Sequence, residues 1–409
     1  MKRLLALLLL IVNASCKNAT NETSNKTTDP TGMELSNLKQ LVSPADSSSA
    51  EPYLFTDKNG LVYLSWVEKR KDTNWLKFSM LNNGQWTAPQ VISSGNNWFV
   101  NWADYPQLAA DGANSLVAHF LEKSGTGTFT YDVKLTTSTD RGKTWSTPGI
   151  LHNDGKKAEH GFVSMIPYND NYFISWLDGR NTATEGEGGN HEGHHGQMTI
   201  RGAVTDKQGK KSGDWELDNR VCDCCQTSAA ITTNGPVVVY RDRSDDEIRD
   251  ISIVRMVNNK WTTPKTIFPD NWKIAGCPVN GPKVVAEGNN LAVAWFSSPE
   301  KKDQVNIIFS EDGGATFKNP IRIDEGKGIG RVDMVLLDEK TAMVSWMEEA
   351  VIKAVRVHSD GRKDSSMIIA TSSQARASGF PQMTKSGNNL VFAFTDEKQK
   401  TIRVAMLTL

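Results

Sequence analysis

Four cysteines in the second half of the chain carry side chains that can do chemistry. Cys222, Cys224 and Cys225 lie within four positions of the sequence, and Cys277 follows in a later segment. If Cys277 pairs with one of the first group and the other two also pair, the closed loop stabilises the fold by roughly 3–4 kcal/mol. As thiolates, the four would bind zinc or copper, with His160 as an added ligand. Because the spacing does not match two C-x2-C knuckles, we expect disulfides, with a vicinal Cys224–Cys225 bridge as a further alternative.

A glycine-rich segment over 185–195 holds a second group of metal-ligand types. His191, His194 and His195, with neighbouring acids, could hold a metal, but so many glycines are equally typical of a lid over a pocket or of an unstructured excursion. The sequence has no phosphate loop, dinucleotide fingerprint, catalytic-serine elbow or HExxH helix. We therefore predict that no cofactor is required, and a metal at the cysteines or at these histidines is the alternative.

The elements that would position these residues are short strands that recur about every fifty residues. Seven apolar strands end in an aromatic residue, at 62–66, 115–120, 172–176, 237–240, 291–295, 342–346 and 390–394. Most belong to a group of four strands, which is the pattern of a propeller blade. Since no segment has a 3.6-residue period, we expect almost no helix.

The count of these groups predicts the architecture. The last group supplies only three strands before the chain ends, and an isolated strand at 37–44 has the character of a fourth. Pairing the two would close the ring and remove both exposed edges. We therefore predict an all-β fold over 35–409, a single β-propeller with seven blades, with six as the alternative.

Two of the turns share one motif, S-x-D-x-G-x-T-aromatic, at 138–145 and 310–317. The Asp carboxylate can accept hydrogen bonds from the amides of its own turn, and the Gly takes the position with positive φ. The Thr extends the next strand, and the aromatic ring packs on the neighbouring hairpin.

This motif resembles the Asp-box, the bacterial neuraminidase repeat of the sialidase superfamily. The residues that match are Asp140, Gly142 and Trp145 in the first copy, and Asp312, Gly314 and Phe317 in the second. The resemblance implies a sialidase-like propeller and says little about chemistry, because in that family the motif lies away from the active site. Sialidase catalytic domains have six blades, so a count of seven departs from them.

We number the four strands of a blade from one to four, starting at the axis. Propeller topology then brings two kinds of connection to one face, which we call the mouth: those from strand four of one blade to strand one of the next, and those from strand two to strand three. Carboxylates, guanidiniums, one histidine and all four of the cysteines fall in these connections, and such a set is the default site for a ligand. The resemblance implies an arginine cluster for a sugar carboxylate, an acid/base Asp, and a Tyr nucleophile activated by a Glu. The arginine motif of that family is absent here, so the candidates rest on loop position alone. They are Asp104, Glu159, His160 and Tyr240 as catalytic residues, and Arg180, Arg241, Arg243, Arg331 and Arg376 as substrate-binding residues.

From these residues we predict a sialidase-like exo-acting glycoside hydrolase of sialylated or related acidic glycans. The alternative is a non-catalytic binding or assembly module, with a metal held by the cysteine cluster. Either would take a glycan or another small acidic ligand at the axial pocket. A net charge of −1 gives no reason to expect nucleic acid, and we expect a monomer.

The first residues are typical of a bacterial lipoprotein leader. Lys2 and Arg3 precede an apolar run too short to span a bilayer, and Asn13 to Cys16 resembles a lipobox with an unusual Asn. We expect a signal peptide over 1–16, lipidation of Cys16, a flexible tether over 17–34, and a location at the cell envelope, anchored in the membrane by the lipid.

Overall fold

A computed structural model describes residues 37–183 and 196–409. The expected leader, Cys16, the tether, and His191, His194 and His195 lie outside these ranges. Within the described residues, none of the helical segments is long and apolar enough to cross a membrane. The described residues belong to one compact unit.

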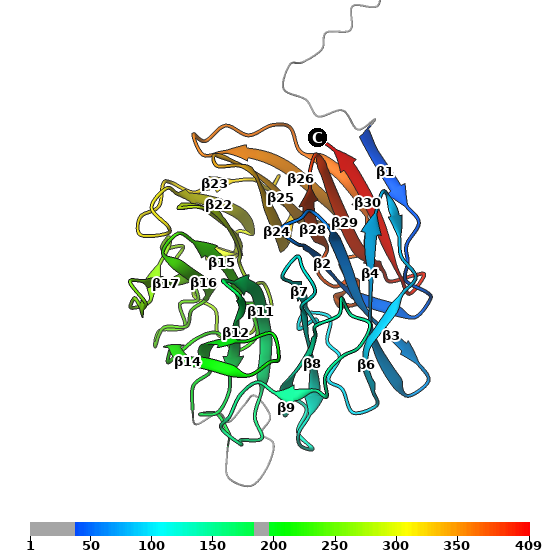
Figure 1. Cartoon of the computed structure of the whole chain (residues 1–409). Coiled ribbons are helices and arrows are strands. Elements are labelled where there is room, and N and C mark those ends of the chain that lie inside the picture. The colour runs from blue at the N-terminus through cyan, green and yellow to red at the C-terminus, as the bar shows by residue number, and fades with distance from the viewer. Residues whose placement is uncertain (1–36, 184–195) are drawn as a thin grey trace, which may run out of the picture. The chain divides into compact units, whose positions relative to one another are not determined.

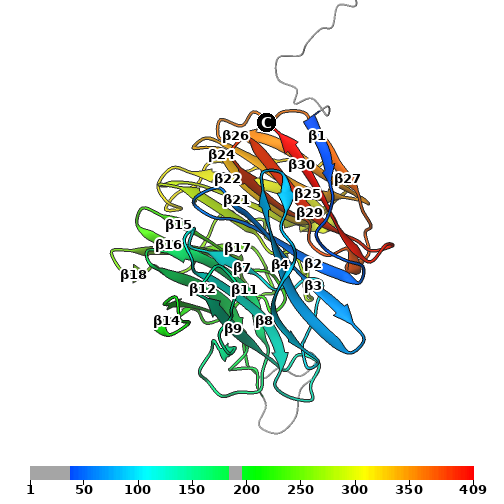
Figure 2. The ribbon, with the colours of Figure 1, turned by 45° about the vertical axis from the view of Figure 1, so that its right-hand side comes forward.

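That unit is a seven-bladed β-propeller, so the prediction of seven blades is confirmed. Seven antiparallel sheets follow one another along the chain, and each contains four or five strands. Figures 1 and 2 show the blades succeeding one another from blue to red, with the last blade beside the first. The first strands of neighbouring blades contact one another in a closed ring around the axis.

The first four blades run from the inner strand outward. Blade one contains β2 (Ser49–Thr56), β3 (Val62–Arg70), β4 (Thr73–Asn82), β5 (Gln85–Trp86) and β6 (Gln90–Gly95). Blade two contains β7 (Leu108–Ala110), β8 (Leu116–Lys123), β9 (Tyr131–Ser138) and β10 (Gly149–Ile150). Blade three contains β11 (His160–Tyr168), β12 (Asn171–Asp178), β13 (Thr199–Thr205) and β14 (Lys211–Asp218). Blade four contains β15 (Ser228–Thr232), β16 (Gly235–Arg241), β17 (Ile251–Val257), β18 (Lys260–Trp261) and β19 (Lys265–Thr266).

The remaining three blades follow the same order. Blade five contains β20 (Lys283–Glu287), β21 (Asn290–Ser297), β22 (Gln304–Ser310) and β23 (Ile321–Arg322). Blade six contains β24 (Gly328–Asp338), β25 (Thr341–Glu348), β26 (Val351–His358) and β27 (Met367–Thr371). Blade seven contains β28 (Gln382–Ser386), β29 (Asn389–Asp396), β30 (Thr401–Thr408) and, as its outer strand, β1 (Leu38–Leu41). The helical turns are the 3-10 segments η2 (Pro299–Lys301) and η3 (Arg376–Ser378).

The ring closes through the N-terminal strand, as the sequence predicts. β1 pairs antiparallel with β30, and Leu38 faces Leu407 in the register. This pairing gives the last blade its fourth strand and covers the edge that β30 would otherwise present.

The second strand of each blade is apolar on both faces because neighbouring blades pack on both sides of it. Four of these strands bury a tryptophan near their mouth end, Trp66, Trp176, Trp295 and Trp346. The indole N–H of Trp176 donates to Asp178 at 2.8 Å, and that of Trp346 donates to Glu348 at 2.7 Å. Acidic residues at the ends of these strands therefore serve the packing of the blades.

The two S-x-D-x-G-x-T turns have matching hydrogen bonds. In both, the Asp accepts bonds from the Thr amide at 2.9 Å and the Thr hydroxyl at 2.6 Å. Gly142 and Gly314 have φ of +82° and +84°, as expected, and a Cβ on Gly142 would lie 2.3 Å from the Phe78 ring. The expectation for Thr144 is wrong, because its hydroxyl closes the turn and the residue does not belong to a strand.

Candidate functional site

The mouth of the propeller brings together residues from several blades. Arg331, at the start of blade six, lies over the ring of Trp102 at 5.1 Å. Two residues further along the chain from Trp102, Asp104 accepts a hydrogen bond from the Phe162 amide of blade three at 2.7 Å. Loops far apart in the sequence therefore meet at this face.

Two carboxylates and a phenol form a buried group between blades two and three. The Tyr131 hydroxyl lies 2.8 Å from Glu159 Oε1 and 3.3 Å from Asp104 Oδ2. Asp104 is 3% exposed, Glu159 8% and Tyr131 0%. A single hydroxyl proton can serve only one of the two carboxylates at a time, so the group is suited to sharing protons.

Burial sets the protonation of this group. Burial raises the pKa of Asp104 to about 7, against the lowering effect of its bonds from Phe162 and Tyr131. It also raises the pKa of Glu159 well above its ordinary range, and the charge of Asp104 adds to that shift. A carboxyl that titrates near neutral pH can act as a general acid or base.

Close packing fixes this group in place. A Cβ on Gly161 would lie 2.1 Å from Asp104 Oδ2, so only glycine allows the carboxylate this position. The ring of Tyr131 stacks on Phe99, with centroids 4.1 Å apart and an interplanar angle of 10°. The hydroxyl of Tyr131 is therefore held toward the two carboxylates.

A second cluster of ionisable residues begins at His160, the residue that follows Glu159. The rings of His160 and His152 stack 3.6 Å apart, and Asp154 bonds them at 3.1 and 2.6 Å. Arg180 donates two bonds of 2.8 Å to Asp178, which also faces His160 at 3.7 Å. Burial would raise the pKa of Asp154, but the two histidines more than offset it and hold that pKa below its ordinary range. The structure thus places His160 and Arg180 in one network with Asp154 and Asp178.

The other predicted arginines have their own partners. Arg241 is buried and donates to the backbone carbonyls of Asn280, Arg249 and Phe296. Arg331 donates to Ser378 and Gly379 and to the loop that precedes η3.

Arg241 and Arg331 therefore hold loops in place, and a role for either in binding an acidic ligand stays a prediction.

The last two predicted arginines differ from these. Arg243 pairs with Glu247 at 2.7 Å and with Asp223 at 3.3 Å, and Arg376 is exposed.

Tyr240, the predicted nucleophile, donates to Asp218 at 2.6 Å and is packed in the core. Burial raises its pKa well above the ordinary range of a phenol. Tyr131 is the tyrosine that meets a Glu, and sequence reasoning missed it because it reads as the first residue of an ordinary buried strand. Its position opposite the loop that carries Asp104 was the available signal.

The four cysteines gather at the mouth as free thiols, and the expected disulfides are not formed. The sulfur of Cys222 lies 3.8 Å from that of Cys224 and 3.7 Å from that of Cys225. Cys277 is the exposed member of the set, and a hydrogen bond with Cys224 lowers its pKa. His160 is not part of this cluster, since its ring nitrogens face Tyr131 and Asp154.

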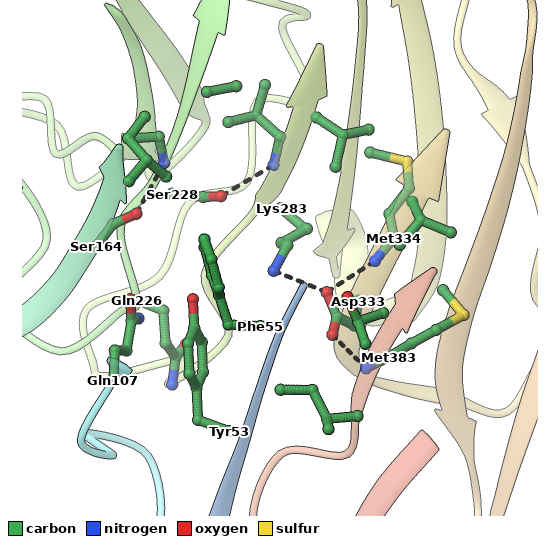
Figure 3. Close-up of a pocket in the computed structure, with 18 of the residues that line it drawn as sticks. Tyr53, Phe55, Gln107, Ser164, Gln226, Ser228, Lys283, Asp333, Met334 and Met383 are labelled. Atoms are coloured by element: carbon green, nitrogen blue, oxygen red, sulfur yellow. Dashed lines mark hydrogen bonds and ion pairs between the residues drawn. The ribbon is translucent and has the colours of Figure 1, made fainter. Parts of the chain in front are cut away.

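A pocket of about 430 Å³ occupies the axis. Among the residues that line it, Lys283 and Asp333 are the charged ones, and their ion pair measures 2.9 Å. Tyr53 and Tyr105 lie on the same pocket with their rings 6.2 Å apart. Figure 3 shows Lys283 and Asp333 facing each other, with Tyr53 and Gln226 nearby. Burial would lower the pKa of Lys283, but Asp333 and Tyr105 raise it, so the ammonium stays charged.

Side chains rather than backbone ladders join the inner strands around this pocket. The Ala229 amide donates to Ser164 at 3.0 Å, and the Val284 amide donates to Ser228 at 3.1 Å (Figure 3). Asp333 accepts from the Met383 amide of the next blade at 2.6 Å. The polar residues that line the pocket therefore also hold the ring together.

Comparisons with solved structures support the fold. A PL25 ulvan lyase bound to -[GlcA(1-4)Rha3S]- is 11% identical, with a TM-score of 0.55 and 90% of this chain and 96% of that chain covered. The polysaccharide lyase Uly1 is 8% identical, with a TM-score of 0.53 and coverage of 88% and 90%. The NanB sialidase from Streptococcus pneumoniae is 9% identical, with a TM-score of 0.47 and coverage of 91% and 94%.

No protein-family model and no curated protein sequence matches this chain, so the Asp-box stays a resemblance. At such identities, the two polysaccharide lyases show that the chain shares their fold and show nothing of its activity.

Proposed function

We propose that this protein is a carbohydrate-active enzyme that cleaves acidic glycans, and that Asp104, Tyr131 and Glu159 transfer the protons. One observation carries the proposal. The Tyr131 hydroxyl lies between two buried carboxylates at the mouth, 2.8 and 3.3 Å away. Cleavage of a glycosidic bond by hydrolysis or elimination needs an acid and a base that work near neutral pH.

The sialidase-like version of this chemistry assigns one role to each residue. Tyr131 would attack the anomeric carbon, which is the tyrosine route known among glycosidases. Its side chain is 0% exposed and burial raises its pKa well above the ordinary range of a phenol, so this attack requires the site to open and an ionised Glu159 to take the phenol proton. Asp104, with its pKa of about 7, would protonate the leaving oxygen and then activate water. In an eliminating enzyme, the same group would instead remove the C5 proton of the uronide and protonate the leaving oxygen at C4, as the C4–C5 double bond forms.

None of the three proton-transferring residues lines the axial pocket, but that pocket offers the contacts that an acidic sugar needs. Tyr53 and Tyr105 offer ring faces to the sugar, and Gln107 and Gln226 offer amides. The Lys283 ammonium is half-buried and lies among these residues, so it is the group that we expect to meet a carboxylate. The bound substrate would share Lys283 with Asp333.

The experiment is a cleavage assay of the purified chain on sialosides and on uronic-acid polysaccharides. New reducing ends report hydrolysis, and an unsaturated uronide absorbance reports elimination. Tyr131→Phe and Asp104→Asn should each lower the rate by about 10²–10⁴-fold.

Tyr172→Phe is the matched control, because Tyr172 is equally buried and its hydroxyl donates to the Ser115 carbonyl at 2.8 Å. Absence of cleavage across the panel would leave the non-catalytic binding module as the function. Equal rates for Tyr131→Phe and the wild type would remove this catalytic group.

A further inference from the structure

The four cysteines form a cluster that the proposed glycan chemistry does not use. Cys222, Cys224 and Cys225 follow β14 of blade three and precede β15, and each of the three is buried. Their sulfurs all lie within 4.8 Å of one another. Cys277 comes from the connection that precedes β20 of blade five, beside Cys224, although its sulfur does not lie within 4.8 Å of all three of the others. Two adjacent inter-blade connections therefore share one group of thiols.

The spacing of the sulfurs matches that of a zinc thiolate site. Zinc binds cysteine sulfur at about 2.3 Å in tetrahedral geometry, which separates neighbouring sulfurs by about 3.8 Å. Cys222 lies 3.8 Å from Cys224 and 3.7 Å from Cys225.

The charges around the cluster favour a divalent ion. Arg249 donates to the Cys222 sulfur at 3.1 Å and also pairs with Glu247. Arg241, which lies nearby, donates its hydrogen bonds to neutral backbone carbonyls, so its charge is not paired by them. Zn²⁺ with the three buried thiolates and that of Cys277 carries two negative charges, which the guanidiniums of Arg241 and Arg249 offset. Cu⁺ with the same four thiolates would carry three negative charges, which is less favourable.

We propose that Cys222, Cys224 and Cys225 bind a zinc ion and that Cys277 of the neighbouring blade is its fourth ligand. Such an ion would fix the segment that carries Gln226. The Gln226 amide donates to the Ala103 carbonyl at 2.6 Å and accepts from the Gly281 amide at 2.9 Å. The zinc would thus hold the loops of blades two, four and five at the edge of the axial pocket.

The first test is the metal content of the full chain, purified without added metal or chelator. We expect about one zinc per chain, and Cys222→Ser should reduce it below about one tenth. Cys277→Ser should still bind the ion, but its affinity for zinc, measured in competition with a zinc-binding dye, should fall by at least about tenfold. Ala229→Ser is the control, because it adds a hydroxyl to the same buried region without removing a sulfur.

The second test does not depend on the folding of any variant. Removing the ion from the wild type with a strong chelator should lower the melting temperature, and zinc alone should restore it. Cobalt in place of zinc should give the visible bands of a tetrahedral thiolate complex, and Cys277→Ser should change them.

A metal-free protein whose four cysteines are oxidised, or whose four thiols react freely with no affinity for zinc, would overturn the proposal. Copper(I) retained in place of zinc would overturn the assignment of the ion. None of these readouts depends on glycan cleavage, so the zinc proposal stands or falls apart from the proposed function.

Discussion

Two carboxylate clusters lie side by side at the junction of blades two and three, and the pKa values of their carboxyls are shifted in opposite directions. In one, Asp104 and Glu159 share the Tyr131 hydroxyl and have raised pKa values. In the other, Asp154 lies between two histidines and has a lowered pKa. Glu159 and His160 are consecutive in the chain, so sequence position does not separate the clusters. Among the residues that the structure describes, Asp154 bonds two histidines, whereas Asp104 and Glu159 share a phenol, and this is why the first cluster is the catalytic candidate and the second a structural one.

Removing the Tyr131 hydroxyl should give the largest difference between the two clusters, in the rate of glycan cleavage. Tyr131→Phe leaves two buried carboxylates with no shared donor, and cleavage of an acidic glycan should fall by about 10²–10⁴-fold. Asp154→Asn in the neighbouring cluster should leave the chemical step within about threefold of the wild type once the protein is folded. Single-turnover rates of the two variants measure the difference. A larger loss for Asp154→Asn would reverse the assignment of the two clusters.

Asp154→Asn should lower the free energy of unfolding, although it should hardly change the rate of cleavage. Asp154→Asn removes the carboxylate that bonds both His152 and His160, and the buried rings then lack that acceptor. The free energy of unfolding should fall by about 1–3 kcal/mol. Denaturant unfolding monitored by tryptophan fluorescence measures it, with Asp360→Asn, an exposed residue, as the control. An unchanged midpoint would show that the histidine cluster contributes nothing.

Gly161 tests how tightly the first cluster is built. Its added methyl would lie 2.1 Å from Asp104 Oδ2, so Gly161→Ala must displace the carboxylate or the strand. We expect a loss of about 1–3 kcal/mol in unfolding free energy, together with a loss of cleavage. Gly155→Ala is a useful contrast, since nothing lies within 4 Å of a Cβ there, although its φ of +66° carries its own cost. Full activity of Gly161→Ala would show that the position of Asp104 does not matter.

The pH dependence of stability gives the sharpest contrast between the two clusters. Asp104 has a raised pKa of about 7, so its contribution is complete below about pH 4, the ordinary pKa of an aspartate, and is lost as the pH rises through 7. Asp154 has a lowered pKa, so its contribution is present above about pH 4 and is lost as the pH falls further.

Asp104→Asn should therefore flatten the fall in unfolding free energy between pH 4 and 7, by at most about 1.4 kcal/mol per pH unit. Asp154→Asn should flatten only the acid limb. Melting curves from pH 3 to 8.5 measure both, and a wild-type slope unchanged by Asp104→Asn would contradict the raised pKa.

The fold could be predicted from the sequence because its signal repeats. Strands such as 172–176 and 342–346 recur with the same apolar pattern, and each additional copy reinforces the blade pattern. The closing strand was also predictable, since the last blade lacks one strand and 37–44 supplies it.

The candidate site was predictable only as a face. Blade topology places Asp104 and Glu159 at the mouth, but the phenol that joins them comes from the start of a third strand, where Tyr131 reads as core. Lys283 was missed for a similar reason, because alternation along β20 does not show which side chains reach the axis. The turn residue Thr144 reads as the start of a strand, and only the fold shows its hydroxyl bonding Asp140.

The seam between β1 and β30 has a consequence for how the polypeptide acquires its structure. Leu38 must find Leu407, so the circle cannot be completed until nearly the whole polypeptide has left the ribosome. Contacts between such distant residues make folding slow, and an unfinished circle leaves an open strand for other chains to join. Deleting residues 38–41 should therefore favour aggregation during synthesis, even though it removes none of the residues at the mouth.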